Sequence, residues 1–134
     1  MRLYSFTNYY LSSLQHGLQT AHVVAEMWYK YASVNSPANS KALKLFEWQR
    51  WHQTIIIKNG GNQKALRDLI TLFSGGSLYP WAVFQEDQDS LGGVIGAVGI
   101  VVPEKFYSPD WAIQTFTPWE LQLLDLIQRT PLAV

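Results

Sequence analysis

The chain has 134 residues, a length that suits one globular domain, and residues 1–134 are expected to form it. Hydrophobic residues make up 48% and charged residues 15%, which supplies a core and argues against disorder. The lack of cysteine excludes disulfide scaffolds, thiolate zinc sites and a cysteine nucleophile, and it favours a reducing, cytoplasmic compartment.

Net charge is zero, but the charges are divided along the sequence. Residues 1–67 hold eight Lys/Arg against two Glu, a net +6, whereas residues 68–134 hold two against eight Asp/Glu, a net −6. A basic patch from the first half would suit an RNA backbone. Alternatively, the halves interleave in space and the asymmetry disappears. The longest apolar run, 94–102, is too short to span a membrane and no leader peptide is evident, so a soluble protein is expected.

The first third of the chain predicts one strand and two helices. Residues 2–9 combine aromatic and β-branched side chains and predict a strand. A helix is expected up to about residue 33, and Ser12 and Gln15 are spaced as its capping box. A second helix is expected over 38–51, where apolar and basic residues alternate.

Two strands and one helix are expected in the middle of the chain. The β-branched run 54–57 predicts a strand covered on both faces. The segment 59–62 predicts a turn, in which Asn62 caps a helix over 63–73. A strand is then expected over 80–85.

An acidic loop separates that strand from a buried one over 94–102. A last helix begins at Thr117, with Pro118 at its first position and Glu120 at its third. The order β-α-α-β-α-β-β-α predicts a three-layer α/β/α domain around a mixed, mostly parallel four-stranded sheet. Ligands bind beyond the carboxyl ends of strands in such sheets. The first helix begins just after the first strand, and the acidic loop follows the third. Both therefore lie at that edge of the sheet if these two strands run parallel.

The first helix carries a narrow polar stripe of Gln15, Gln19, His22 and Glu26, spaced at i, i+4, i+7 and i+11. Its other residues are mostly apolar, so the helix is expected to be buried on most sides. The stripe must then be satisfied internally or face a wet cleft. The capping box explains Gln15 as well as a ligand would, whereas Gln19 has no such local role. Glu26, one turn after His22, can orient the imidazole.

The acidic loop offers Glu86, Asp87, Asp89 and Ser90. A carboxylate at a strand end can take a proton from water, although a solvated turn has the same composition. Gly96 either makes room for a ligand or permits close packing, because its glycine spacing does not match a dinucleotide motif. His16 and His22 are six residues apart and diverge on a helix, so a two-histidine zinc site is not expected.

These residues resemble the type 2 peptidyl-tRNA hydrolase family, more closely its small divergent members from phages and bacteria. The first-helix pattern carries the resemblance, and the segments at 52–59, 81–86, 96–100 and 131–133 support it. The residues of the first-helix pattern are Leu11-Ser12, Gln15, Gln19-x-x-His22 and Ala25-Glu26-Met27.

The resemblance implies hydrolysis of the ester between a peptide and the tRNA 3′ end, without a metal, cofactor or covalent intermediate. The family's Gln-x-x-His motif falls on Gln19 and His22, and its carboxylate on Glu86, or on Asp87 with a slip of one residue. Gln15 and Gln19 would position the ester carbonyl or the terminal ribose.

The chain departs from the family at three positions. Gln15 stands where better-known members have a lysine, Gly96 stands where a hydroxyl is expected, and Ser90 would supply the hydroxyl of the preceding loop. A missing cation weakens phosphate binding and oxyanion stabilisation. The candidates to replace it are Arg2, Lys30 and Lys58.

The alternative function is a non-catalytic domain of the same fold that binds RNA or protein through aromatic and basic surfaces. The candidate residues for such a surface are Lys41, Lys44, Trp48 and Trp51. The six Trp, seven Tyr and six Phe also favour a homodimer.

Overall fold

The computed structural model describes residues 1–32, 40–87, 93–108 and 115–133. The chain is α/β, and its order of elements differs from the expected one by two short helices, η1 after α2 and η2 after β4. The elements are β1 (Arg2–Asn8), α1 (Ser13–Ala32), α2 (Ser40–Glu47), η1 (Trp48–His52), β2 (Thr54–Gly61), α3 (Gln63–Ser74), β3 (Trp81–Gln85), β4 (Ile95–Val102), η2 (Glu104–Phe106) and α5 (Pro118–Arg129).

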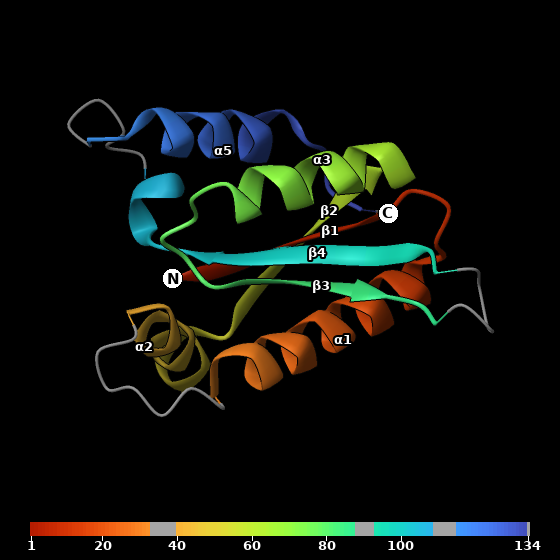
Figure 1. Cartoon of the computed structure of the whole chain (residues 1–134), viewed down its shortest axis with the longest axis horizontal. Coiled ribbons are helices and arrows are strands. Elements are labelled where there is room, and N and C mark those ends of the chain that lie inside the picture. The colour runs from red at the N-terminus through yellow and green to blue at the C-terminus, as the bar shows by residue number, and fades with distance from the viewer. Residues whose placement is uncertain (33–39, 88–92, 109–114, 134) are drawn as a thin grey trace.

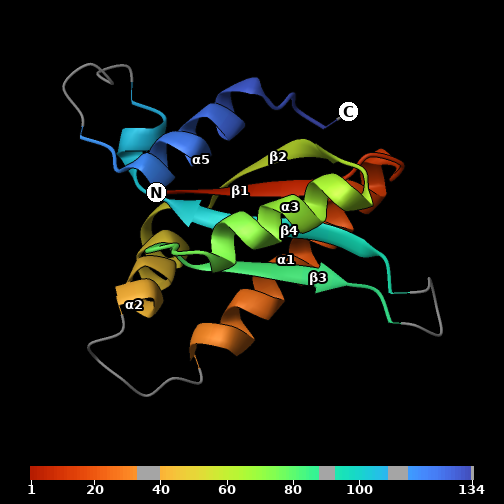
Figure 2. The same cartoon turned by 45° about the horizontal axis from the view of Figure 1, so that its top comes forward.

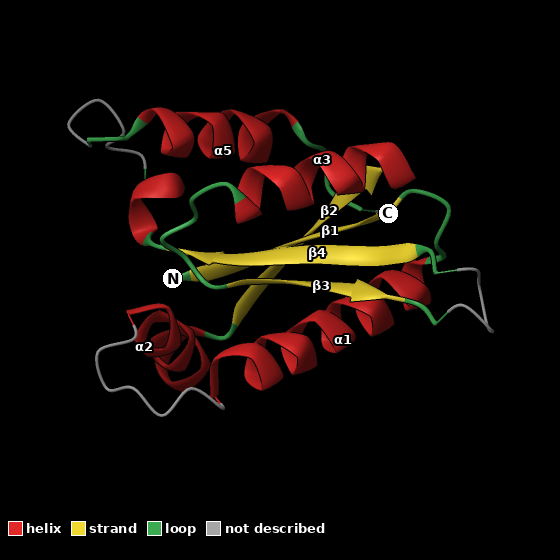
Figure 3. Ribbon diagram, in the orientation of Figure 1, coloured by secondary structure: helices red, strands yellow, loops and turns green. Residues whose placement is uncertain are grey.

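The four strands form one mixed sheet in the order β2-β1-β4-β3 (Figure 3). Only β1 and β2 pair in parallel, and β4 is antiparallel to both of its neighbours. The expectation of a mostly parallel sheet is therefore wrong, because the 86–94 link between β3 and β4 is too short for a crossover. Since β1, β2 and β3 still run in the same direction, their carboxyl ends share one end of the sheet.

Helices cover both faces of this sheet (Figures 1 and 2). α1 and α2 lie on one face, where Leu3, Val23 and Met27 are fully buried. α3 and α5 lie on the other face, over a core that contains Phe6 and Leu123. β4 is buried along its whole length, as its continuous apolar sequence predicts.

The predicted helix caps are confirmed. Asn62 accepts a hydrogen bond at the start of α3, and Thr117 and Glu120 form the capping box of α5. Ser12 and Gln15 form the equivalent pair before α1: each backbone N–H donates to the other's side chain. These caps depend on residues three apart, which is why the sequence alone reveals them.

Two expectations about buried surfaces are wrong. β2 is an edge strand whose Ile55 is 42% exposed, so the run 54–57 is not covered on both faces. α1 is not buried on most sides either, because Leu14 and Leu18 on its outer face are 83% and 53% exposed. The second helix also changes character, continuing past Glu47 as the π-helical turn η1. None of the described helices is both long and apolar enough to cross a membrane.

Glu120 is a buried carboxylate at the start of α5. Burial alone would raise its pKa, but the bonds from Lys105, the Thr117 N–H and the Tyr79 hydroxyl outweigh this and lower the pKa to about 2. The charged form of Glu120 therefore ties η2, α5 and the segment before β3 together.

We expect Glu120→Gln to destabilise the protein at pH 7 by about 3 kcal/mol, because the folded pKa lies well below its ordinary value. A lowered carboxylate pKa contributes stability above pH 4.5 that is lost as the pH falls towards 2. The difference between wild type and variant should shrink over that interval in urea unfolding. Asp125→Asn is the matched control, because its ion pair with Arg129 is exposed and contributes little. A wild type whose stability does not fall relative to Glu120→Gln would contradict this account.

Candidate functional site

Two residues that are distant in sequence meet where the carboxyl end of β3 lies against α1. The Gln19 side chain is 5% exposed, and its Nε2 donates to Glu86 Oε1 at 2.8 Å. Glu86 directly follows β3. Since strand residues alternate between faces, Ala82, Phe84 and Glu86 all point towards α1. The structure thus brings together the amide and the carboxylate that the resemblance selected.

A carboxylate only accepts hydrogen bonds, so the contact fixes which way the Gln19 amide points. Gln19 Oε1 is directed at Gly96, where a Cβ would lie 2.0 Å from it. This oxygen is buried, and no residue that the structure describes donates a hydrogen bond to it. The space at Gly96 therefore holds the Gln19 side chain, in place of the ligand that one interpretation of the sequence suggested.

A β-bulge explains how Gly96 reaches this place. Phe84 pairs with Ala97 and Gln85 pairs with Ile95, which leaves Gly96 as an extra residue of β4. Gly96 and Ala97 consequently both face α1. Sequence periodicity does not reveal such a bulge, because the apolar run 94–102 reads as an uninterrupted strand.

His22 lies one turn after Gln19 and is half-buried. Its ring stacks on Phe84, with centroids 4.2 Å apart and planes at 17°. Glu26, which was expected to orient the imidazole, is exposed and makes no hydrogen bond to it. Phe84 therefore positions His22. The sequence could have indicated this role, because strand alternation places Phe84 on the same face as Glu86.

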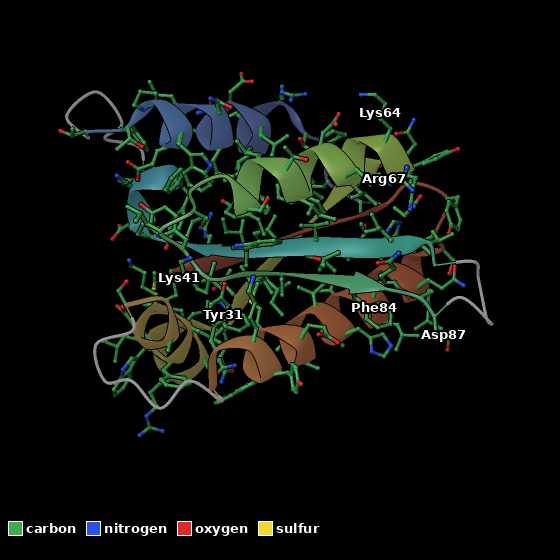
Figure 4. The ribbon with its side chains drawn as sticks, in the orientation of Figure 1. Tyr31, Lys41, Lys64, Arg67, Phe84 and Asp87 are labelled. Carbon is green, nitrogen blue, oxygen red and sulfur yellow. The ribbon has the colours of Figure 1, made fainter. Side chains whose placement is uncertain are left out.

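The remaining predicted site residues are exposed or lie outside the described part of the chain. Gln15 is exposed and its Oε1 is engaged by the Ser12 N–H in the capping box. Asp87 lies beyond the end of β3 and is exposed (Figure 4). Glu86 rather than Asp87 is thus the carboxylate that meets Gln19. Ser90 and Asp89 lie outside the described residues.

None of the three basic residues proposed to replace the family lysine is at this place. Lys30 donates to Trp81 O at the start of β3, the end opposite Glu86. Arg2 pairs with Val102 at the far end of β4 and stacks on Tyr107. Lys58 belongs to the edge strand β2 and donates to Thr130 O.

A buried polar layer beneath the site fixes the rotation of α1 on β1. Ser5 bonds to Thr20 at 2.8 Å, and Thr7 bonds to His16 Nδ1 at 2.5 Å. Burial lowers the pKa of His16, which favours its neutral form. Because this layer satisfies the polar groups of α1 next to Gln19, the helix cannot turn without losing these bonds.

No three His, Asp or Glu side chains gather to hold a metal within the described parts of the chain. A hollow of about 650 Å³ does exist, but on the opposite face between α3 and α5, where Leu69, Leu126 and Pro131 border it. It contains none of the predicted site residues. The chemistry of the Gln19–Glu86 pair is therefore that of an oriented carboxylate at the end of a strand.

The chain matches none of the known protein-family models, and no curated protein matches it.

We expect Gly96→Ala to destabilise the protein by about 1–3 kcal/mol, because the new Cβ would overlap Gln19 Oε1. In a Gln19→Ala background the same substitution should cost much less, giving a coupling energy of about 1 kcal/mol or more in urea unfolding.

Gly99→Ala is the matched control. Its Cβ would lie 2.6 Å from Val23 Cγ1, so removing the Gln19 side chain should not relieve it. Equal coupling energies for the two glycines would show that Gly96 does not face Gln19.

Proposed function

We propose that the chain hydrolyses a carboxylic ester and that peptidyl-tRNA is its substrate class. The contact between Gln19 and Glu86, 67 residues apart in sequence, supports this most directly. The resemblance gave these residues separate roles in one reaction, and the fold puts their polar atoms within hydrogen-bond distance. A reaction of this kind needs no metal or covalent intermediate.

In the proposed reaction Glu86 is the general base. Its Oε1 is held by Gln19, and no described residue hydrogen-bonds its Oε2. Oε2 takes a proton from water, and the water oxygen forms a bond to the ester carbonyl carbon. When the tetrahedral intermediate breaks down, the bond to the ribose oxygen is cleaved and Glu86 returns the proton to that oxygen. The products are the peptide acid and tRNA with a free hydroxyl.

Gln19 and His22 have supporting roles in this proposal. Gln19 holds the carboxylate in one orientation, so that little reorganisation is needed when the proton moves. The ring of His22, held flat on Phe84, presents its nitrogens at the border of the site as hydrogen-bond groups for the ester or the ribose. Gln15 lies about one turn further towards the start of the helix, where it can contact the substrate only by leaving its cap.

The test is hydrolysis of an N-acetylated aminoacyl-tRNA by the purified full chain. We expect Glu86→Gln to lower kcat/KM by about 10²-fold or more, the usual contribution of a general base. Gln19→Ala should lower kcat more than it raises KM, because its contact orients the base.

Two controls accompany this measurement. Asp87→Asn tests the neighbouring carboxylate and should change kcat/KM less than Glu86→Gln does. Asp68→Asn removes an exposed carboxylate of α3 and should have no effect. The proposal fails if the wild type shows no hydrolysis, or if Glu86→Gln is as active as Asp68→Asn.

A second candidate function, RNA binding without turnover, is favoured by the opposite end of the same face. Lys30 Nζ lies 3.6 Å from the centre of the Trp81 ring, and burial together with Lys41 lowers its pKa to about 8. Lys44 donates to Leu78 O nearby. Figure 4 shows Lys41 of α2 at this end, far from Phe84. Cations gathered next to aromatic rings are typical of a surface that binds a nucleic-acid backbone.

If this end binds RNA, tRNA affinity should fall steeply with salt, with a log–log slope of about −2 for two or three phosphate contacts. Lys44→Gln should make the slope shallower by about one contact, whereas Lys64→Gln, an exposed lysine paired with Asp68 on α3, should not. Binding without hydrolysis supports the second function. An absence of binding at low salt excludes RNA as a partner and contradicts both proposed functions.

A further inference from the structure

The outer face of α1 is apolar and exposed. Leu14, Leu18, Ala21, Ala25 and Trp28 follow one another at alternating spacings of four and three residues, and all are exposed. That alternation is the spacing of the seam between two packed helices. The inner face of α1 is already covered by the sheet, so the exposed seam is a second packing surface on the same helix.

Charge is absent from most of this helix. Residues 13–25 contain no Lys, Arg, Asp or Glu, and the only charged residues of α1 are Glu26 and Lys30 near its end. A solvent-facing helix normally carries charges on its outer side. Helices that lie on membranes also carry several Lys or Arg on their polar face, which α1 does not. The outer face of α1 is thus better suited to a protein surface than to water or to lipid.

The exposed seam continues onto α2. Trp28 contacts Phe46, with ring centroids 5.4 Å apart, and Leu43 is exposed beside them on α2. Together with Tyr29 the exposed large side chains offer on the order of 700 Å² of surface, close to the 800 Å² that each partner contributes to a standard interface. Few monomers leave so large an apolar patch uncovered.

We infer that a second copy of this chain covers this surface, with the two α1 helices antiparallel. The seam has its small residues, Ala21 and Ala25, in the middle, and larger residues at both ends. In an antiparallel pair Ala21 of one copy meets Ala25 of the other, which lets the helix backbones approach closely. The Leu14–Leu18 end of each copy then meets the Trp28 end of its partner. Such a surface is complementary to itself about a twofold axis, as a closed dimer requires.

The inference does not depend on the proposed function, because dimerisation and hydrolysis are measured separately. It does place two copies of the site near one another. His22 and Gln15 border the seam on the side that faces Glu86, and the second helix would lie beside them. Any substrate would thus approach between the second copy and the end of β3.

The test is sedimentation of the full chain over a concentration series. We expect a dimer with a Kd in the micromolar range or below. Leu18→Glu would bury an unpaired charge in the seam and should raise this Kd by about 100-fold or more. Leu121→Glu is the matched control, because Leu121 is 52% exposed against 53% for Leu18 and lies on α5, across the sheet. It should leave the Kd within a few-fold of wild type. Circular dichroism confirms that both variants are folded.

Engineered thiols test the direction of the helices in a chain that has no cysteine of its own. The double variant Ala21→Cys/Ala25→Cys should form intermolecular disulfides on oxidation. Leu14→Cys alone should not, because the two positions are about 27 Å apart along an antiparallel pair. A wild type that stays monomeric at about 0.5 mM overturns the inference, as does a monomer that binds lipid vesicles through this face. Equal dimerisation of Leu18→Glu and Leu121→Glu also overturns it, and cross-linking through Leu14→Cys overturns the antiparallel arrangement.

Discussion

The close approach of α1 to β4 is the constraint on which the rest of this structure depends. Two glycines of β4 face the helix, and a Cβ on either would overlap a side chain of α1: Gln19 at Gly96, and Val23 at Gly99. The helix therefore lies closer to the strand than ordinary side chains allow. At that distance the Gln19 side chain hydrogen-bonds to Glu86 at the end of β3, and the His22 ring stacks on the ring of Phe84. If α1 lay further from β4 by the thickness of one side chain, neither contact would form.

This constraint also divides α1 into surfaces with different roles. The inner surface holds apolar residues such as Met27. It also holds Thr20 and His16, which are hydrogen-bonded to Ser5 and Thr7 of β1. The border that faces β3 carries Gln19 and His22. The outer surface remains apolar and exposed. One helix thus carries the packing, the candidate chemistry and the inferred contact with a second copy, which is why its sequence shows so few charges.

Local signals predicted much of this fold, and long-range pairing explains most of what they missed. Capping residues such as Asn62 and Thr117 act within one turn, so the helix starts were predictable. The order of the strands in the sheet was not, because nothing within residues 54–57 indicates that β2 is an edge strand. The bulge at Gly96 depends on how β3 and β4 pair, and pairing lies outside any single segment.

For the candidate site, the sequence offered more residues than the structure brings together. Periodicity placed Gln15, Gln19, His22 and Glu26 on one stripe, but only Gln19 and His22 contact the end of β3. Glu86 was separated from Asp87 by strand alternation, which turns only one of two adjacent carboxylates towards α1. The roles of Phe84 and Gly96 depend on distances between elements, which no sequence spacing encodes.

The surroundings of the Gln19 amide indicate that stability alone does not explain the presence of this residue. No described residue donates a hydrogen bond to its buried Oε1, an arrangement that costs about 1–3 kcal/mol. An apolar residue at position 19 would avoid that cost and would pack against Gly96 and Phe84, as Val23 packs against Gly99 one turn further along. Natural proteins keep such local conflicts mainly where a site needs them. The amide does one thing that an apolar side chain cannot do: it holds a carboxylate in a fixed orientation at the edge of the sheet.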